Sequence, residues 1–289
     1  MVVARERRDL LVAGHVNVDH YLRVAGFPGA DRTSPVVDER TELGGTATTL
    51  ARVAARCGVR VGLLSRVGDG FPTRFRAVLA AAGIDLRGLV EVKGVPTPTC
   101  TIVEDRQGTT RTLIQQGPMG SAPEPAAPGG WWRTYRWLHL ATGEPAYYLR
   151  LARAARAMGA HVALDPAQEI LYRWDRSMFR RILPFAEILF GNRAEIARAT
   201  AWLGGRNPER LLEHVPLVVR TEGTAGATAF SRGGVVHVPA ARPKRRRTLV
   251  GAGDAFRGGF YGAWFAGRPL ADCLAAGHRE AAARIEGRR

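Results

Sequence analysis

The chain has 289 residues, of which 46% are hydrophobic and 8% aromatic, enough to bury the core of one large α/β domain or of two smaller ones. This composition excludes a disordered chain, a collagen-like chain and a disulfide-stapled miniprotein. No apolar run approaches the roughly 20 residues that span a bilayer, so we expect no membrane partner. The net charge of +16 favours anionic ligands such as nucleotides and sugar phosphates. Because the arginines are scattered along the chain, we do not expect nucleic acid as the main partner.

Cysteine usage and the first residues both indicate a reducing compartment. Cys57, Cys100 and Cys273 lie far apart and form no CxxC pair, which argues against a disulfide framework and a zinc knuckle. Residues 1–16 contain only a short apolar stretch and no small-residue cleavage site, so they do not read as a secretory signal. We therefore expect a cytoplasmic protein.

Short apolar runs alternate with helical patterns from one end of the chain to the other. In chain order, the pattern predicts a strand at Asp9–Val16, a helix at Thr46–Cys57, a strand at Val59–Val67, a helix at Pro72–Ala82, a strand at Trp137–Ala141, a helix at Ala146–Met158, a strand at His161–Leu164, a helix at Arg176–Ile182, a strand at Glu187–Phe190, a helix at Arg193–Leu203 and a strand at Leu217–Arg220. This alternation is typical of an α/β fold, in which helices flank a central and mostly parallel sheet.

Two segments, at about residues 20–43 and 97–117, break this rhythm because they are rich in Thr, Val, Gly and Pro and have no helical period. Within the second, Thr99–Glu104 and Thr110–Gln115 read as a β-hairpin. We expect both segments to form a small β-sheet lid that interrupts one domain spanning the whole chain, followed by a surface loop at Gly120–Gly130. Exposed lid strands favour edge pairing, so we also expect a homodimer formed through the lid.

The stretch from Gly251 to Phe256 reads Gly-Ala-Gly-Asp-Ala-Phe and opens a helical run after a short apolar piece. Glycines at a helix start let backbone N–H groups converge on an anion, and the helix dipole adds to the attraction. A carboxylate just behind such a cradle, here Asp254, is well placed to take a proton from a hydroxyl that attacks phosphorus. The same letters also fit a glycine-rich turn that binds nothing.

Two further motifs lie near the N-terminus. Asn17 and Asp19 follow the first predicted strand, and ligands of open α/β sheets bind beyond the carboxyl ends of strands, so these side chains suit a polyol. Gly44 and Gly45 open the helix predicted at Thr46–Cys57 and allow a ligand to approach the backbone. An Asx turn and a glycine-rich helix entry are the plain structural alternatives.

Two more motifs follow strands in the second half of the chain. Asn192 and Glu195 stand one helical turn apart, so both can face a metal-bound triphosphate, although a helix-capping box has the same spacing. Thr221–Gly226 offers a backbone nest for phosphates. The basic run Lys244–Arg247 leads into the Gly251 stretch and either edges a nucleotide pocket or forms a solvated loop.

In order and spacing, these five motifs, together with Ala81–Asp85, resemble the PfkB family of carbohydrate kinases, the ribokinase-like kinases. The resemblance extends from Leu10 to about Ile285 and implies a ribokinase-like α/β fold with a small β-sheet lid. It further implies a role for each motif. Asp254 is expected to be the catalytic base, and the amides of Gly251, Ala252 and Gly253 the anion hole. The acceptor is expected to contact Asn17, Asp19, Gly44, Gly45, Thr49 and Glu144. The nucleotide and its Mg²⁺ are expected to contact Asn192, Glu195, Thr221, Gly223, Gly226 and His278, with Glu195 acting on the metal indirectly.

The sequence departs from the family pattern at several positions. Thr248 stands where the family usually has an Asp that many members tie to a monovalent-cation site. Thr49 stands where an Asn commonly follows the paired glycines, and His278 where an Asn often lies near the adenine. Few residues follow Asp254, so the terminal segment that helps to wall the nucleotide and cation sites is expected to be short or absent.

The resemblance implies an ATP-dependent, Mg²⁺-requiring kinase that phosphorylates a primary hydroxyl of a sugar or sugar-like small molecule. Such transfer needs mainly positioning and charge stabilisation from the protein. A nucleoside kinase is the alternative on the same scaffold. From a different class, a non-catalytic ligand- or nucleic-acid-binding protein stays open, because of the arginine excess and the departures at Thr248, Thr49 and His278.

Overall fold

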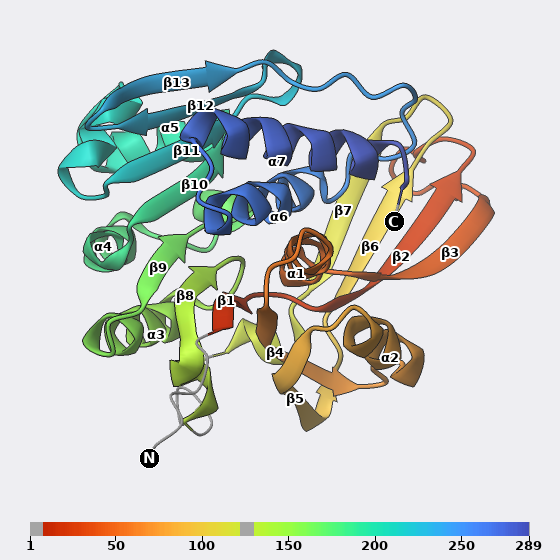
Figure 1. Cartoon of the computed structure of the whole chain (residues 1–289). Coiled ribbons are helices and arrows are strands. Elements are labelled where there is room, and N and C mark those ends of the chain that lie inside the picture. Colours follow the sequence, from red (N-terminus) through yellow and green to blue (C-terminus); the bar gives the residue numbers. More distant parts are fainter. Residues whose placement is uncertain (1–7, 122–129, 289) are drawn as a thin grey trace.

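Nine strands form the larger of two sheets in the computed structural model, which describes residues 8–121 and 130–288 (Figure 1). Their spatial order is β13 (Gly234–Val238), β12 (Ala227–Ser231), β11 (Leu217–Thr221), β10 (Ile188–Asn192), β9 (His161–Leu164), β8 (Tyr135–Leu140), β1 (Arg8–Ala13), β4 (Val61–Asp69) and β5 (Asp85–Pro96). All neighbours from β11 to β5 pair in parallel, whereas β12 and β13 are antiparallel. The predicted fold class is therefore confirmed.

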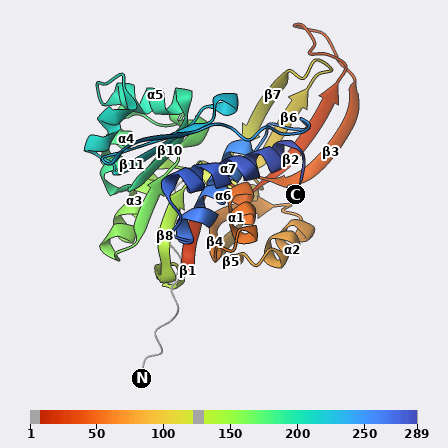
Figure 2. The same cartoon turned by 45° about the horizontal axis from the view of Figure 1, so that its top comes forward.

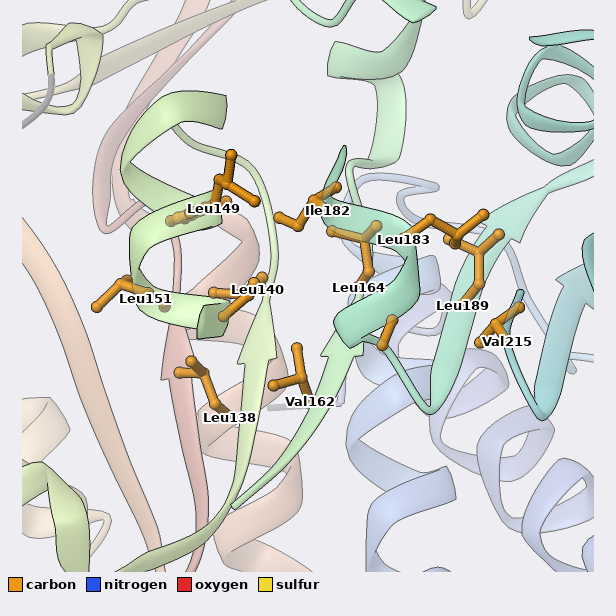
Figure 3. Packing of buried hydrophobic residues seen from close by; sticks show 14 of the residues in the cluster. Leu138, Leu140, Leu149, Leu151, Val162, Leu164, Ile182, Leu183, Leu189 and Val215 are labelled. Carbon is orange, nitrogen blue, oxygen red and sulfur yellow. The ribbon is translucent and has the colours of Figure 1, made fainter. Parts of the chain in front are cut away.

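Helices cover both faces of this sheet. One face carries α1 (Thr46–Arg56), α2 (Thr73–Ala81), α6 (Ala252–Phe265) and α7 (Leu270–Ile285), and the other carries α3 (Pro145–Ala157), α4 (Arg176–Ile182) and α5 (Arg193–Trp202). Successive side chains of β1 point to opposite faces, so Leu10 and Val12 join the first layer while Leu11 and Ala13 join the second. Figure 3 shows the second layer, where leucines and valines of β8 and β9 meet α3 and α4.

Local signals start three of the helices. Glu144 caps α3 with its carboxylate, and Pro145 occupies the first helical position, where no N–H is needed. Asp175 caps α4 in the same way. Asn192 and Glu195 form a reciprocal capping box at the start of α5. Of these helices, α3 begins shortly after β8 and α5 directly after β10, at the strand ends where a parallel sheet gathers its ligand contacts.

The smaller sheet has the order β3 (Val36–Gly44), β2 (Asn17–Val24), β6 (Thr99–Glu104) and β7 (Thr110–Gln115). It projects from one side of the α/β layers (Figure 2). The expected strand at Asp9–Val16 is wrong at its end, because β1 stops at Ala13 and the chain enters the small sheet at Asn17. Asn17 and Asp19 thus belong to the small sheet, which begins three residues before the expected start of the lid segment at about residue 20.

The remaining boundaries agree with the expected elements to within a few residues, and β9, α4 and the β6–β7 hairpin match them. The strands β5, β12 and β13 and the helix α7 were not expected. Most of the expected loop at Gly120–Gly130 lies outside the described residues. Among the described residues, no helix is both long and apolar enough to cross a membrane.

Candidate active site

A cavity of about 500 Å³ lies between the small sheet and the start of α6. Most of the predicted site residues line it, namely Asn17, Asp19, Gly45, Thr49, Asn192, Glu195, Thr221, Gly223, Gly251, Gly253 and Asp254. These residues come from β2, the starts of α1, α5 and α6, and the end of β11. Segments that are far apart in sequence therefore meet at one place.

A second cavity of about 330 Å³ adjoins the first and holds three of the other predicted residues, Ala252, Gly226 and His278. The two cavities share Thr221, Gly223, Leu249 and Gly253 in their walls. Phe256 packs edge-on against His278, with 5.1 Å between ring centroids. Burial lowers the pKa of His278, so this pocket presents a neutral imidazole beside apolar side chains of α7. Arg246 also lines it, which places part of the Lys244–Arg247 run at a cavity edge.

The neighbours of Gly44 and Gly45 explain why both positions are glycine. A Cβ at Gly44 would fall 1.9 Å from Asp19 Oδ2, and a Cβ at Gly45 would fall 2.2 Å from the carbonyl oxygen of His15. Gly45 also has φ of +99°, which side chains rarely tolerate. The glycines therefore let the Asp19 carboxylate and the His15 backbone lie directly against the entry to α1.

Asn17 and Asp19 are each only 5% exposed, yet their Oδ1 atoms have no hydrogen-bond partner among the described residues. Burial raises the pKa of Asp19 to about 7, against the opposing effect of Arg284. Buried polar oxygens without partners are costly in a folded protein. Because both residues line the cavity, a ligand that donates hydroxyl groups can satisfy them.

The glycine cradle begins at Gly251, which caps α6 in the left-handed conformation with φ of 77°. Asp254 is the third residue of that helix, and the first N–H groups of a helix lack intrahelical acceptors. The amide of Ala252 donates to the carbonyl of Leu249 at 3.3 Å, so one of the three expected anion-hole donors already has an acceptor. Gly253 lies against Arg257, because a Cβ there would be 2.7 Å from Nη1.

Charged groups gather behind Asp254. Arg257 donates from Nη2 to Asp165 Oδ1 at 2.8 Å, and both side chains are almost fully buried. Burial raises the pKa of Asp254 to about 7, whereas Arg257 and Arg284 act in the opposite direction. A carboxyl with a pKa near neutrality suits general-base chemistry.

The Asn192–Glu195 pair is tied together. Glu195 accepts from the backbone N–H of Asn192 at 2.7 Å and from its side-chain Nδ2 at 2.8 Å. Burial raises the pKa of Glu195. Both carboxylate oxygens thus already have donors, and the described residues contain no group of three or more His, Cys, Asp or Glu arranged to hold a metal. The arrangement suits Mg²⁺ only if phosphate and water oxygens supply most of the ligands.

Two expected acceptor residues do not line the cavity. Gly44 lies behind Asp19, and Glu144 turns its carboxylate to the backbone N–H of Tyr147 at 2.6 Å to cap α3. Glu169, which was not predicted, does line the cavity. The structure therefore gives Glu144 a structural role at a helix start.

Several residues at the cavity were not predicted, and three of them, His15, Thr142 and Glu169, are joined by hydrogen bonds that run through Gln116. His15 Nε2 lies 2.5 Å from Gln116 Oε1, and Nδ1 lies 2.8 Å from Thr142 Oγ1. Burial lowers the pKa of His15 to about 4, so the ring is neutral, and one of its nitrogens donates while the other accepts. Glu169 accepts from the N–H of Gly143 at 2.6 Å and from Gln116 Nε2 at 3.4 Å. This network ties the end of the small sheet to the large one.

Two arginines, Arg257 and Arg284, also went unpredicted. Arg257 follows Asp254 by one helical turn, so its place on the same face of α6 could have been recognised. Arg284 comes from the end of α7, and no local pattern connects it with the cradle. Both line the larger cavity.

A parallel sheet with a glycine cradle, a carboxylate behind it and a second sheet over the acceptor side defines a ribokinase-like phosphotransferase. The chain belongs to the pfkB family of carbohydrate kinases, whose sequence model matches residues 7–288. It is a kinase that phosphorylates a hydroxyl group.

Several relatives of the chain are nucleoside kinases. The chain is 32% identical to a nucleoside kinase of Methanothermobacter thermautotrophicus, over 93% of this chain and 86% of that one. It is 28% identical to a cytidine kinase of Thermococcus kodakarensis, over 93% of each. The crystal structure of the nucleoside kinase of Methanocaldococcus jannaschii, an archaeal member of the ribokinase family, superposes with a TM-score of 0.90 at 26% identity, covering 97% of this chain and 92% of that one.

Proposed function

We propose that this chain is an ATP-dependent, Mg²⁺-requiring nucleoside kinase that phosphorylates the primary hydroxyl of the ribose. The observation that carries the proposal is the mixed lining of the larger cavity. Polar Asn17, Asp19 and Asp254 line it together with apolar Ile102 and Ile114 of the small sheet.

The polar side chains of the lining suit a ribose. The unpartnered Oδ1 atoms of Asn17 and Asp19 accept hydrogen bonds from vicinal hydroxyls, which would leave the primary hydroxyl to face Asp254. Asp254 then takes the proton of the attacking hydroxyl. The backbone N–H groups at the start of α6 stabilise charge on the transferred phosphoryl group.

The apolar side chains of the lining favour a nucleoside over a free sugar. Ile102, Ile114 and the aromatic ring of Tyr172 would have nothing apolar to cover if the acceptor were a sugar alone. A base attached to the ribose fills this space and can lie against the ring. The nucleoside kinases among the relatives support the same choice.

The second cavity supports nucleotide binding. Its walls combine apolar side chains of α6 and α7 with His278, a composition that suits a purine ring, and it opens onto Thr221 and Gly223. An ADP complex is known for the ribokinase of Cryptococcus neoformans, which shares the fold at 20% identity. We assign Ala252, Gly226 and His278 to the donor side.

Mg²⁺ fits the electrostatics of the site. Two basic side chains, Arg257 and Arg284, act on Asp254, and Arg257 is also paired with Asp165. With Asp165, Glu195 and Asp254, three carboxylates face these two arginines, so negative charge is in excess among these groups. Glu195 and Asn192 would act through water molecules, since both carboxylate oxygens already accept hydrogen bonds. The metal would supply charge neutralisation on the phosphates.

The small sheet is proposed to act as a lid on one continuous kinase domain. Cys100, Ile102, Thr112 and Ile114 face the cavity from β6 and β7. A sheet in this position excludes water from the transferring phosphoryl group.

The test is an ADP-release assay with ATP and Mg²⁺ across nucleosides, free ribose, hexoses, ribose 1-phosphate and fructose 6-phosphate. We expect kcat/KM for at least one nucleoside to exceed that for ribose at least a hundredfold. A free sugar or sugar phosphate that outperforms every nucleoside overturns the nucleoside assignment and leaves the kinase assignment standing. Asp254→Asn serves as the inactive control.

A further inference from the structure

The end of α7 holds the segment that leads into the glycine cradle. The carbonyl oxygen of Ile285 accepts hydrogen bonds from the N–H groups of Arg247, at 2.9 Å, and Thr248, at 3.3 Å. The carboxylate of Glu286 accepts from the N–H of Lys244 at 2.7 Å. A segment with no helix or strand of its own is therefore anchored to the last turn of a helix.

Arg284 continues this anchoring into the active site. Its Nε donates to the carbonyl oxygen of Val250 at 3.0 Å. A Cβ on Gly251 would lie 3.2 Å from the same nitrogen, so the guanidinium packs against the first glycine of the cradle. Arg284 is half-buried and lines the larger cavity.

The charge of Arg284 acts on two carboxylates of the site, those of Asp19 and Asp254. Burial raises the pKa of Asp19 and of Asp254, and in each case Arg284 acts against the rise. One guanidinium is thus shared between the carboxylate assigned to the acceptor and the carboxylate assigned to proton removal. Both views place the end of α7 beside the small sheet, from which Asp19 comes (Figure 1, Figure 2).

We propose that Arg284 is a positioning residue for phosphoryl transfer, which fixes Val250 and Gly251 so that the cradle faces the transferred group, and which places a permanent positive charge between Asp19 and Asp254. The inference rests on the proposed function, because the two carboxylates take their roles from it. Arginine suits this task because it stays charged under all working conditions and its planar group holds a fixed orientation.

A purely structural role would have a different signature. If Arg284 served only as a hydrogen-bond donor to the Val250 carbonyl oxygen at the end of α7, its loss would lower the stability of the protein and leave turnover of the folded enzyme unchanged. A positioning role requires the reverse, namely a lower kcat in a folded protein with little change in substrate affinity.

The decisive variant is Arg284→Met, which keeps most of the apolar stem and removes the donor and the charge. We expect kcat to fall about 10- to 100-fold, the range for losing a charge-assisted hydrogen bond, with KM for ATP within about threefold. Added guanidinium chloride at low millimolar concentration should restore part of the rate. Arg279→Met, at an exposed position of the same helix, is the matched control and should keep wild-type kcat with no rescue.

A folded Arg284→Met with kcat within threefold of wild type overturns the proposal, as does a loss that guanidinium does not reverse at all. If Arg284→Met does not fold, Arg284→Gln keeps a donor for Val250 without the charge, and the same expectations apply. If the wild type phosphorylates no acceptor tested, the nucleoside kinase proposal fails. The role of Arg284 is then tested by the rate at which wild type and Arg284→Met hydrolyse ATP with water as the acceptor, and the same loss and rescue are expected.

Discussion

Replacing Asp254 by Asn should abolish turnover and make the protein more stable. The side chain keeps its shape but cannot accept the proton of the attacking hydroxyl, so kcat should fall by about 10²–10⁴-fold, the usual contribution of a general base. Burial raises the pKa of Asp254 from 3.8 to about 7, which means that the folded protein disfavours the ionised carboxylate. Asparagine removes that penalty.

The size of the stability gain follows from the same shift. About three pKa units at roughly 1.4 kcal/mol each set an upper limit near 4 kcal/mol. Asp254 lies at a cavity wall and is partly exposed, so solvent reduces this to about 1–3 kcal/mol. The sign is fixed, because a raised carboxyl pKa costs stability fully above pH 7, progressively less between pH 7 and 4, and nothing below the unfolded-state value.

The assay compares ligand-free wild type and Asp254→Asn by thermal melting at pH 8 and pH 5, together with kcat at saturating substrate. We expect the variant to melt several degrees higher at pH 8, at roughly 2 °C per kcal/mol, and to lose most of that advantage at pH 5. Asp272→Asn is the control, since Asp272 is also the third residue of its helix but is exposed on α7. It should leave kcat unchanged and cost about 0.3–1 kcal/mol through the helix dipole.

Two results would refute this reasoning. Turnover of folded Asp254→Asn within fivefold of wild type would show that another group removes the proton. A melting temperature of Asp254→Asn below that of wild type at pH 8 would show that the ionised Asp254 carboxylate stabilises the start of α6, as in a plain helix turn. Its burial would then carry no net cost in stability.

Three further changes test other parts of the site. Asp19→Ala should lower kcat/KM for the acceptor about 10- to 150-fold in steady-state assays, and an unchanged value would remove Asp19 from the acceptor site. Asp165→Ala leaves Arg257 as an unpaired buried charge and should cost about 3–5 kcal/mol in urea unfolding, whereas a loss below 1 kcal/mol would mean that the guanidinium finds another partner. Because Thr248 is uncharged and Arg284 already donates to the adjoining Val250 carbonyl, initial rates in potassium, sodium and tetramethylammonium chloride should agree at equal ionic strength, and severalfold activation by potassium would contradict this.

The parts of the fold that could be predicted are those with a strong local period. The β6–β7 hairpin alternates around a polar turn, and α4 follows a capping aspartate, so both are visible in a short window. The edge strand β5 could not be recognised because charged residues interrupt its apolar ones. β13 does carry a local signal, because three of its five residues are valine. The end of β1 was hidden because Gly14–Val16 stays buried while the chain passes from one sheet to the other.

The candidate site divides in the same way. The Gly251–Asp254 stretch could be predicted, because the residues that form the cradle are consecutive in the sequence. Glu144 shows a signal that could have been used, since the following Pro145 marks it as a helix cap. Arg284 could not be found, because it is one of 42 basic residues and reaches the cradle only through the packing of α7 against α6.

The contact between Gly44 and Asp19 constrains how this sequence can evolve. The backbone of Gly44 does not itself require glycine, and the three atoms nearest to where a Cβ would lie all belong to the Asp19 carboxyl group, at 1.9–2.2 Å. Substitution at position 44 is therefore epistatic on position 19, and the order of the two changes matters. A lineage that shortens residue 19 is released from the glycine, whereas one that first gains a side chain at residue 44 loses its hold on the acceptor. On this reasoning, a change of acceptor can begin with a substitution at residue 19 but not with one at residue 44.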